Sequence, residues 1–229
     1  MTMTRRAFTT HMGLLAMSST VLAALSVTAA PDKAHGSPSP EVLWQALMAG
    51  NKRFIAGKAR PREVVQKRAK LATGQQPHVI VLGCADSRLS PELIFDQNLG
   101  DLFVVRTAGN IADPVALGSI EYAAEHLHSS LFVILGHEKC GAVIAAASGE
   151  KMPSPNLQAI VDKIHPAVGR VQGKGTGDAL IQHAVEANVQ QSADDILAHS
   201  PILHKAVNDK HLTIIKAVYH LKNGAVTRL

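Results

Sequence analysis

Residues 78–88, HVIVLGCADSR, decide the fold. The stretch opens with an uninterrupted apolar run at 79–82 and closes with Cys84, Asp86 and Arg88. An apolar run that contains β-branched residues and no polar alternation is typical of a strand buried on both faces of a parallel sheet. In such sheets ligands bind beyond the carboxyl ends of the strands, so the polar residues that follow this strand are candidates for a functional site.

Two later segments have the same apolar character, at residues 102–105 (LFVV) and 131–135 (LFVIL). Helix-start signals separate the three segments, at Ser90-Pro91-Glu92 and at Asp113-Pro114, where a capping residue precedes a proline. Buried strands that alternate with helices predict an α/β fold, with a mostly parallel β-sheet core flanked by helices.

Further elements are predicted on both sides of these strands. Ser39, Pro40 and Glu41 predict the start of an N-terminal helical arm, whose first helix ends by Gly57. The other predicted helices are at residues 62–73, 115–127, 140–147, 156–168 and 178–198. The last part of the chain predicts a strand at 212–219, a tight turn at Asn223-Gly224 and a short C-terminal edge strand.

The composition suits one ordinary domain with a short appendage, since the chain has 229 residues, of which 46% are hydrophobic. The formal net charge of +5 is not concentrated in a basic run, and aromatic residues make up only 3%. We expect no nucleic-acid partner, because such binding uses clustered basic side chains or aromatic stacking platforms.

The appendage is the N-terminus, where residues 1–30 have the layout of an export signal. Arg5-Arg6 precedes an apolar stretch at 12–24, and small residues lead to Pro31. The arginine pair resembles the twin-arginine type, so we expect a periplasmic protein with no stable membrane association after cleavage. A membrane anchor or an apolar N-terminal helix is the alternative. Residues 31–40, rich in Pro, Gly and Ser, are predicted to be a linker.

Cys84 could be a nucleophile, half of a disulfide, a metal ligand or a small buried residue. The second cysteine of the chain, Cys140, also follows a predicted strand, within GHEKCG at 136–141. If the two strands are neighbours, Cys84, His137 and Cys140 can converge, and two thiolates with one imidazole suit a zinc ion. A disulfide is the usual alternative in an exported protein, but the His-x-x-Cys spacing favours metal binding.

The fourth position on such a zinc ion is open to Asp86 or to water. Arg88 can hold the Asp86 carboxylate in a bidentate pair, which would leave the position to water. Zinc lowers the pKa of bound water to about 7 and so supplies hydroxide near neutral pH. If Asp86 binds zinc instead, catalysis stops, and lower pH favours that state.

These motifs resemble a known family. Residues 84–88 (CADSR) with 137–141 (HEKCG) are similar to the signature pair of the β-class carbonic anhydrases, and segments 50–54, 100–110 and 119–123 fit as well. The resemblance extends over 41–229, the predicted catalytic domain, and implies zinc-dependent reversible hydration of carbon dioxide to bicarbonate and a proton. It implies one Zn²⁺ per chain. The implied zinc ligands are Cys84, His137 and Cys140, and the implied catalytic dyad is Asp86 and Arg88.

The same resemblance implies a substrate pocket and a homodimer or tetramer. Gln75 would position the substrate, and the Gly141 N–H would bind a substrate oxygen. Phe103, Ala108 and Tyr122 would line a small apolar pocket, partly donated by a neighbouring subunit; core packing is the alternative role for both aromatic residues.

One departure narrows the expected subtype. Members with a regulatory bicarbonate site carry a tryptophan where this chain has Val81, so we expect Arg88 to hold Asp86 near neutral pH. Two other functions stay open on the sequence: a related zinc hydrolase acting on carbonyl sulfide or carbon disulfide, and a non-enzymatic exported protein that binds zinc or thiols.

Overall fold

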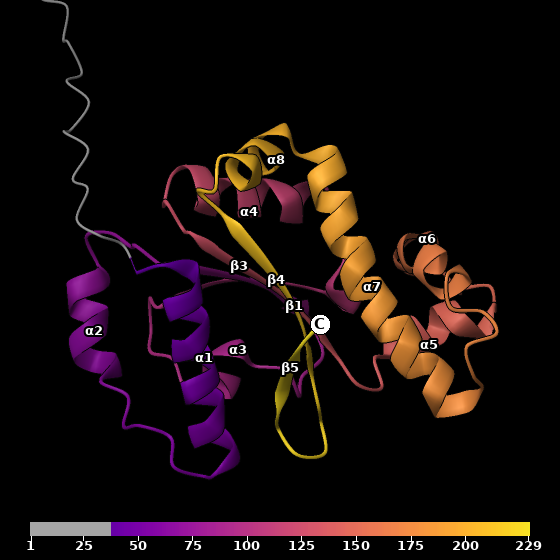
Figure 1. Cartoon of the computed structure of the whole chain (residues 1–229), viewed down its shortest axis with the longest axis horizontal. Helices are drawn as coiled ribbons and strands as arrows, with labels where there is room; N and C mark the ends of the chain where they lie inside the picture. The colour runs from indigo at the N-terminus through magenta and orange to yellow at the C-terminus, as the bar shows by residue number, and fades with distance from the viewer. Residues whose placement is uncertain (1–37) are drawn as a thin grey trace, which may run out of the picture. The chain divides into compact units, whose positions relative to one another are not determined.

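The computed structural model describes residues 38–229, and its core is a five-stranded sheet flanked by helices (Figure 1). The strand order is β2-β1-β3-β4-β5, with every pairing parallel except that of β4 with β5. The strands are β1 Val79–Cys84, β2 Leu102–Thr107, β3 Leu131–His137, β4 Thr213–Tyr219 and β5 Val226–Arg228. The predicted mostly parallel α/β fold and its C-terminal edge strand are confirmed.

Burial of the strands follows their sequence pattern. Every residue of β1 and β3 is buried, as their continuous apolar runs predicted, whereas β2 is mostly half-buried because it lies at one edge of the sheet. The registers of β1 place Cys84 opposite Thr107 of β2 and Gly83 opposite Leu135 of β3. The carboxyl ends of these three strands therefore lie together at one edge of the sheet.

The helices also follow the predicted order. They are α1 Pro40–Ile55, α2 Val64–Leu71, α3 Pro91–Ile94, α4 Pro114–Glu125, α5 Gly141–Ser148, α6 Pro155–Gly169, α7 Gly177–His199 and α8 Pro201–Asn208, and a short 3₁₀ turn, η1, spans Ala108–Asn110. Two of the predicted caps are present, because the Ser39 side chain accepts a hydrogen bond from the Val42 N–H and Asp113 accepts one from Ala116, whereas Ser90 makes no side-chain cap bond. Each cap satisfies an N–H group that the first helical turn leaves free.

One predicted helix is shorter than expected, and another, for which only the start was predicted, is a single turn. The helix predicted at 62–73 is only α2, which has no side-chain cap and no buried residue to extend it. The helix expected after Ser90 is the four-residue α3. It ends because Asp96 adopts a positive φ of 48° and accepts a hydrogen bond from Arg53 Nε at 2.6 Å, which turns the chain out of the helix.

The N-terminal arm is attached to the core by the buried side chains of Trp44 and Leu47 and by a buried polar residue, Asn51. Asn51 of α1 donates to the carbonyl groups of Ile94 and Gly224 and accepts from the N–H of Val226. The predicted signal at 1–30 and most of the predicted linker at 31–40 lie outside the described residues, and Pro40 belongs to α1 instead of the linker. Within 38–229, no helix combines the length and the apolar character that crossing a membrane requires.

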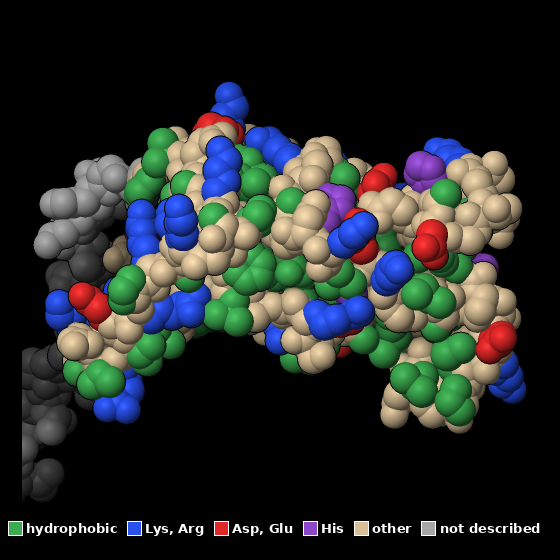
Figure 2. Space-filling view, turned by 90° about the horizontal axis from the view of Figure 1, so that it is seen from below, with side chains coloured by type: hydrophobic (Ala, Val, Ile, Leu, Met, Phe, Trp, Pro, Cys, Tyr) green, Lys and Arg blue, Asp and Glu red, His purple; other side chains and the backbone are tan. Residues whose placement is uncertain are grey.

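The long helix α7 packs against β3 and β4 close to the end of β3 (Figure 1). Gly136 permits this contact, because a Cβ atom there would lie only 2.5 Å from Val189 Cγ2. Side chains of α7 therefore lie close to the edge of the sheet at which β3 ends with His137. On the surface, Figure 2 shows Lys and Arg side chains spread over one face, with hydrophobic and acidic side chains between them.

Candidate metal centre

The strand ends bring three ligand-type side chains into one buried cluster. Cys84 is the last residue of β1, His137 is the last residue of β3, and Cys140 precedes the first turn of α5. Their ligand atoms all lie within 4.8 Å of one another. The three residues expose only 5%, 0% and 1% of their surface, so the cluster is closed to bulk solvent on most sides.

The donor atoms fit a tetrahedral metal ion. The Sγ atoms of Cys84 and Cys140 are 4.0 Å apart, and both cysteines are free thiols. Two thiolates on a tetrahedral zinc ion, each with a Zn–S bond near 2.3 Å, would stand about 3.8 Å apart, whereas a disulfide needs about 2.05 Å. The geometry therefore favours a shared ion over a disulfide.

The hydrogen bond of His137 fixes which ring nitrogen is free. Nδ1 lies 2.8 Å from the carbonyl oxygen of Glu138, and a carbonyl can only accept, so Nδ1 carries the proton. Nε2 then bears a lone pair, and it is buried without a hydrogen-bond partner among the described residues. A buried polar nitrogen normally has a partner. Here the lone pair points to a cation at the cluster, which is the usual arrangement of a metal-bound histidine.

The two thiols differ in how readily each gives up its proton. The hydrogen bond from Cys140 is the largest cause that lowers the pKa of Cys84, to about 4, and the Gly109 N–H adds to it from 3.3 Å. The same hydrogen bond to Cys84, together with burial, raises the pKa of Cys140. A divalent ion would replace the remaining proton, because a thiolate is the form that binds metal.

The Gly109 N–H is itself held in place from α7. Asn188 Nδ2 donates to the Gly109 carbonyl at 2.8 Å, and Ser192 Oγ donates to the Asn110 carbonyl at 3.0 Å. Both side chains are buried, so η1 is fixed against the helix that packs on β3. No feature of the sequence of α7 singled out Asn188 or Ser192, since each looks like an ordinary polar residue in a long helix.

Asp86 and Arg88 form a bidentate pair beside the cluster. Arg88 donates from Nε to Asp86 Oδ1 at 2.9 Å and from NH2 to Oδ2 at 2.7 Å, and its backbone N–H also binds Oδ1. The hydrogen bonds from Arg88 hold the pKa of Asp86 well below its usual range, so the carboxylate is ionised. Oδ2 lies 4.0 Å from His137 Nε2, close to the expected metal position yet turned toward the guanidinium.

Arg106 holds the backbone of the loop that carries this pair. Its Nε donates to the Cys84 carbonyl at 2.9 Å, and its NH2 donates to the Asp86 carbonyl at 2.5 Å. The sequence analysis assigned no role to Arg106. The sequence did offer one signal for this role. Arg106 is a charged residue near the carboxyl end of the otherwise largely apolar strand β2, which places its guanidinium at the functional edge of the sheet.

The predicted substrate residues fall into two groups. Ala108 begins η1 at the same edge as the cluster, and Gly141 follows Cys140, with open space where its Cβ would be. Gln75 precedes β1, so it is separated from Cys84 by roughly 16 Å of strand. Phe103 pairs with Ile80 near the amino end of the sheet.

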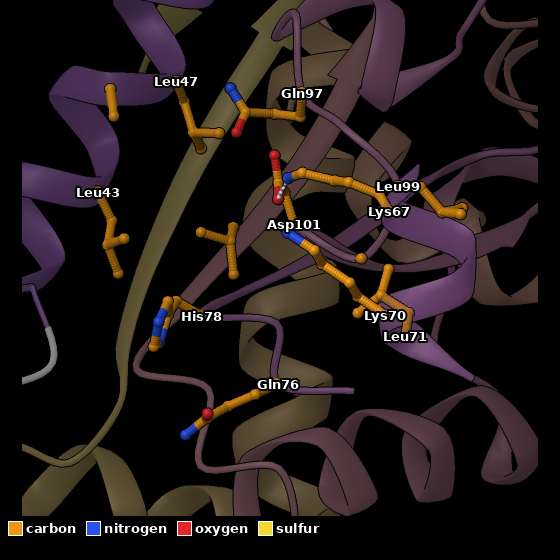
Figure 3. A pocket seen from close by; sticks show the side chains of 13 residues that line it. Leu43, Leu47, Lys67, Lys70, Leu71, Gln76, His78, Gln97, Leu99 and Asp101 are labelled. Carbon is orange, nitrogen blue, oxygen red and sulfur yellow. Dashed lines mark hydrogen bonds and ion pairs between the residues drawn. The ribbon is translucent and has the colours of Figure 1, made fainter. Parts of the chain in front are cut away.

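Tyr122 belongs to the distant group, since its ring lies 6.3 Å from that of Phe103. The fold of one chain therefore leaves Gln75, Phe103 and Tyr122 away from the metal ligands. A groove of about 430 Å³ lies at the same amino-terminal end of β1, between α1 and α2 (Figure 3). Leu43 and Leu47 line one side and Lys67, which pairs with Asp101 at 3.0 Å, lines the other.

Comparison with known proteins matches this site to a family. The family model for carbonic anhydrase matches residues 79–226, which include all three ligand-type side chains. The chain belongs to the carbonic anhydrase family. It is 39% identical over 190 residues to carbonic anhydrase 2 of Mycobacterium tuberculosis, covering 81% of this chain and 91% of that one. The carbonic anhydrase of Mycolicibacterium smegmatis is 37% identical over 192 residues, covering 82% and 92%.

Solved structures of carbonic anhydrases agree. The β-carbonic anhydrase of Coccomyxa in complex with acetazolamide superposes with a TM-score of 0.66 at 26% identity, covering 84% of this chain and 87% of that chain. The β-carbonic anhydrase CcaA gives a TM-score of 0.65 at 26% identity over 81% and 87%. The predicted β-class family is confirmed.

Substitution of any one of the three ligands should remove the metal. We expect the purified Cys84→Ser, His137→Ala and Cys140→Ser variants each to lose most bound metal, because two remaining protein ligands hold zinc poorly. Elemental analysis of the full chain measures this. Asp86→Ala is the matched control and should keep most of the metal. A wild-type protein that contains an oxidised Cys84–Cys140 pair and no metal would contradict the assignment.

Proposed function

We propose that the chain catalyses the zinc-dependent reversible hydration of carbon dioxide to bicarbonate and a proton. The observation that carries the proposal is the buried Cys84–His137–Cys140 cluster with an ionised carboxylate, Asp86, held beside it by Arg88. Two sulfur donors and one imidazole nitrogen form a set that suits zinc. Membership of the carbonic anhydrase family supports the reaction.

The residues of the chain divide the chemical work between them. Zinc, when bound, supplies the Lewis acid that makes water nucleophilic near neutral pH. Arg88 occupies both oxygens of Asp86 and so keeps the carboxylate off the metal position. Asp86, an ionised acceptor, can then bind a proton of the reacting water and orient its lone pair toward carbon dioxide. Gly141, next to the ligand Cys140, could offer its backbone N–H to a substrate oxygen.

Loss of the Asp86 carboxylate should lower the rate without removing the metal. For Asp86→Ala we expect kcat/KM for carbon dioxide hydration to fall about 100-fold or more, because the reacting water loses the group that orients it. Stopped-flow hydration at alkaline pH measures this. Asp194→Ala, which removes an exposed partner of Arg170, should behave as the wild type. Undetectable hydration by zinc-loaded wild-type protein would reject the proposed reaction.

We also propose that the enzyme works as a homodimer or larger homo-oligomer. Gln75, Phe103 and Tyr122 lie too far along the sheet to reach the metal ligands of their own chain. Exposed apolar side chains occur at that end and beside it, including Val65, Leu99 and Tyr122, which expose 66%, 47% and 46% of their surface. A second copy that covers this surface would bring the three substrate residues to its own metal site.

Mixing two inactive variants tests this arrangement. Gln75→Ala subunits keep the metal ligands, and Cys84→Ser subunits keep Gln75, so each mixed dimer contains one complete site. Co-refolding equal amounts should restore about a quarter of the wild-type activity, given random pairing. Cys84→Ser mixed with Asp86→Ala is the control and should stay inactive, because both lesions affect the same end of the sheet. Failure of the first mixture to regain activity would place Gln75 in the site of its own chain.

We propose further that the protein is exported to the periplasm by the twin-arginine route, with cleavage near Ala30. The support is the sequence alone: Arg5-Arg6, the apolar stretch at 12–24 and the small residues before Pro31. Replacing both arginines by lysine should keep the protein inside the cell with its N-terminus uncleaved. Cell fractionation and N-terminal sequencing measure this, and unchanged export would reject the route.

A further inference from the structure

The turn between His137 and Cys140 contains a strained residue that bears directly on the metal centre. Lys139 has a φ of 50°, in the left-handed region that non-glycine residues rarely adopt. The peptide that joins Glu138 to Lys139 carries the carbonyl that accepts the proton of His137 Nδ1. The orientation of this peptide therefore decides whether His137 keeps its lone pair on Nε2. Such strain persists only where the surrounding structure holds it.

Glu138 is held by three hydrogen bonds from one neighbouring segment. Its backbone N–H donates to the Tyr219 carbonyl at 3.1 Å, which continues the pairing of β3 with β4. Its carboxylate accepts from His220 Nδ1 at 2.7 Å and from the Leu221 N–H at 3.0 Å. The first bond fixes only the start of the turn, whereas the two bonds to the carboxylate prevent the Glu138 residue from rotating.

His220 is in turn anchored within the C-terminal hairpin. Its Nε2 is hydrogen bonded to Thr227 Oγ1 at 2.9 Å, and its backbone N–H donates to the Ala225 carbonyl at 2.8 Å. Both ring nitrogens are thus used, one toward Glu138 and one toward β5. The imidazole connects the edge strand to the metal-binding turn.

We propose that His220 is a positioning residue of the metal centre. By clamping the Glu138 carboxylate, it holds the strained turn in the conformation in which the Glu138 carbonyl fixes the tautomer and the ring orientation of His137. The inference rests on the proposed function in one respect, because it takes Cys84, His137 and Cys140 to bind zinc. It adds to that function a residue outside the ligand set, carried on a part of the chain some eighty residues further along.

The partly exposed location of the His220–Glu138 pair argues against a purely structural role. The His220 and Glu138 side chains expose 25% and 29% of their surface and border an open cavity of about 880 Å³, which Arg88 also lines. A partly exposed pair of hydrogen-bonded side chains of this kind adds little to global stability. The consequence of the pair is therefore local, and the local structure that it controls is the turn between two metal ligands.

Zinc retention by variants of the full chain tests the proposal. For His220→Ala we expect zinc to transfer to a colorimetric chelator about tenfold faster than from the wild type, the low end of the effect of lost outer partners of metal ligands. His220→Asn should restore retention, because its amide Nδ2 can donate from the position of the imidazole Nδ1. His199→Ala is the matched control, since His199 bonds only to the Asp195 carbonyl within its own helix.

A second readout separates positioning from folding. The visible spectrum of the cobalt-substituted protein should change in His220→Ala, because the geometry of the His137 ligand changes, and should return in His220→Asn. Wild-type zinc release and an unchanged cobalt spectrum in His220→Ala, with or without a lower melting temperature, would overturn the proposal. A wild-type protein that binds no zinc would overturn the proposed function itself, and the two failures are distinguishable.

Discussion

The parallel pairing of β1 with β3 is the constraint on which the rest of the structure depends. Because the two strands run in the same direction and in a register that matches Gly83 with Leu135, the residues that end them, Cys84 and His137, come together at one edge of the sheet. Apolar packing on both faces of the sheet stabilises the pairing, since every residue of β1 and β3 is buried. The packing of the core and the geometry of the metal centre therefore have one cause.

The polar groups of this buried centre need hydrogen-bond partners, and several of these partners come from distant parts of the chain. The buried thiolate of Cys84 receives the Gly109 N–H, which α7 holds through Asn188. The loop after β1 is held by Arg106 from β2, and the turn after β3 is held by the hairpin of β4 and β5. A buried polar group without a partner is costly, so each ligand is surrounded by residues that orient it.

The sheet also separates the two halves of the expected substrate site. The metal ligands occupy the carboxyl end of the strands, while Phe103 and Tyr122 pack together toward the amino end. Both groups were recognisable as sequence motifs, but their separation was not, because a motif carries no information about which end of a sheet a neighbouring subunit covers. The end of α3 was not predictable from local sequence for a related reason: Asp96, just after the helix, is bound by Arg53, which lies far away in the sequence.

By itself, the sequence determined the class of fold, the order of the strands along the chain, the helix caps at Ser39 and Asp113 and the three ligand-type residues. These features depend on local patterns: continuous apolar runs, capping residues before prolines, and cysteine and histidine directly after strands. Only the tertiary structure decided which ring nitrogen of His137 is free, and the outer contacts made by Asn188, Arg106 and His220. The outer contacts join segments that are distant in sequence, so they are defined only once the sheet has brought those segments together. His137 bonds to the adjacent residue, but that bond depends on the positive φ of Lys139, which no local sequence pattern predicted.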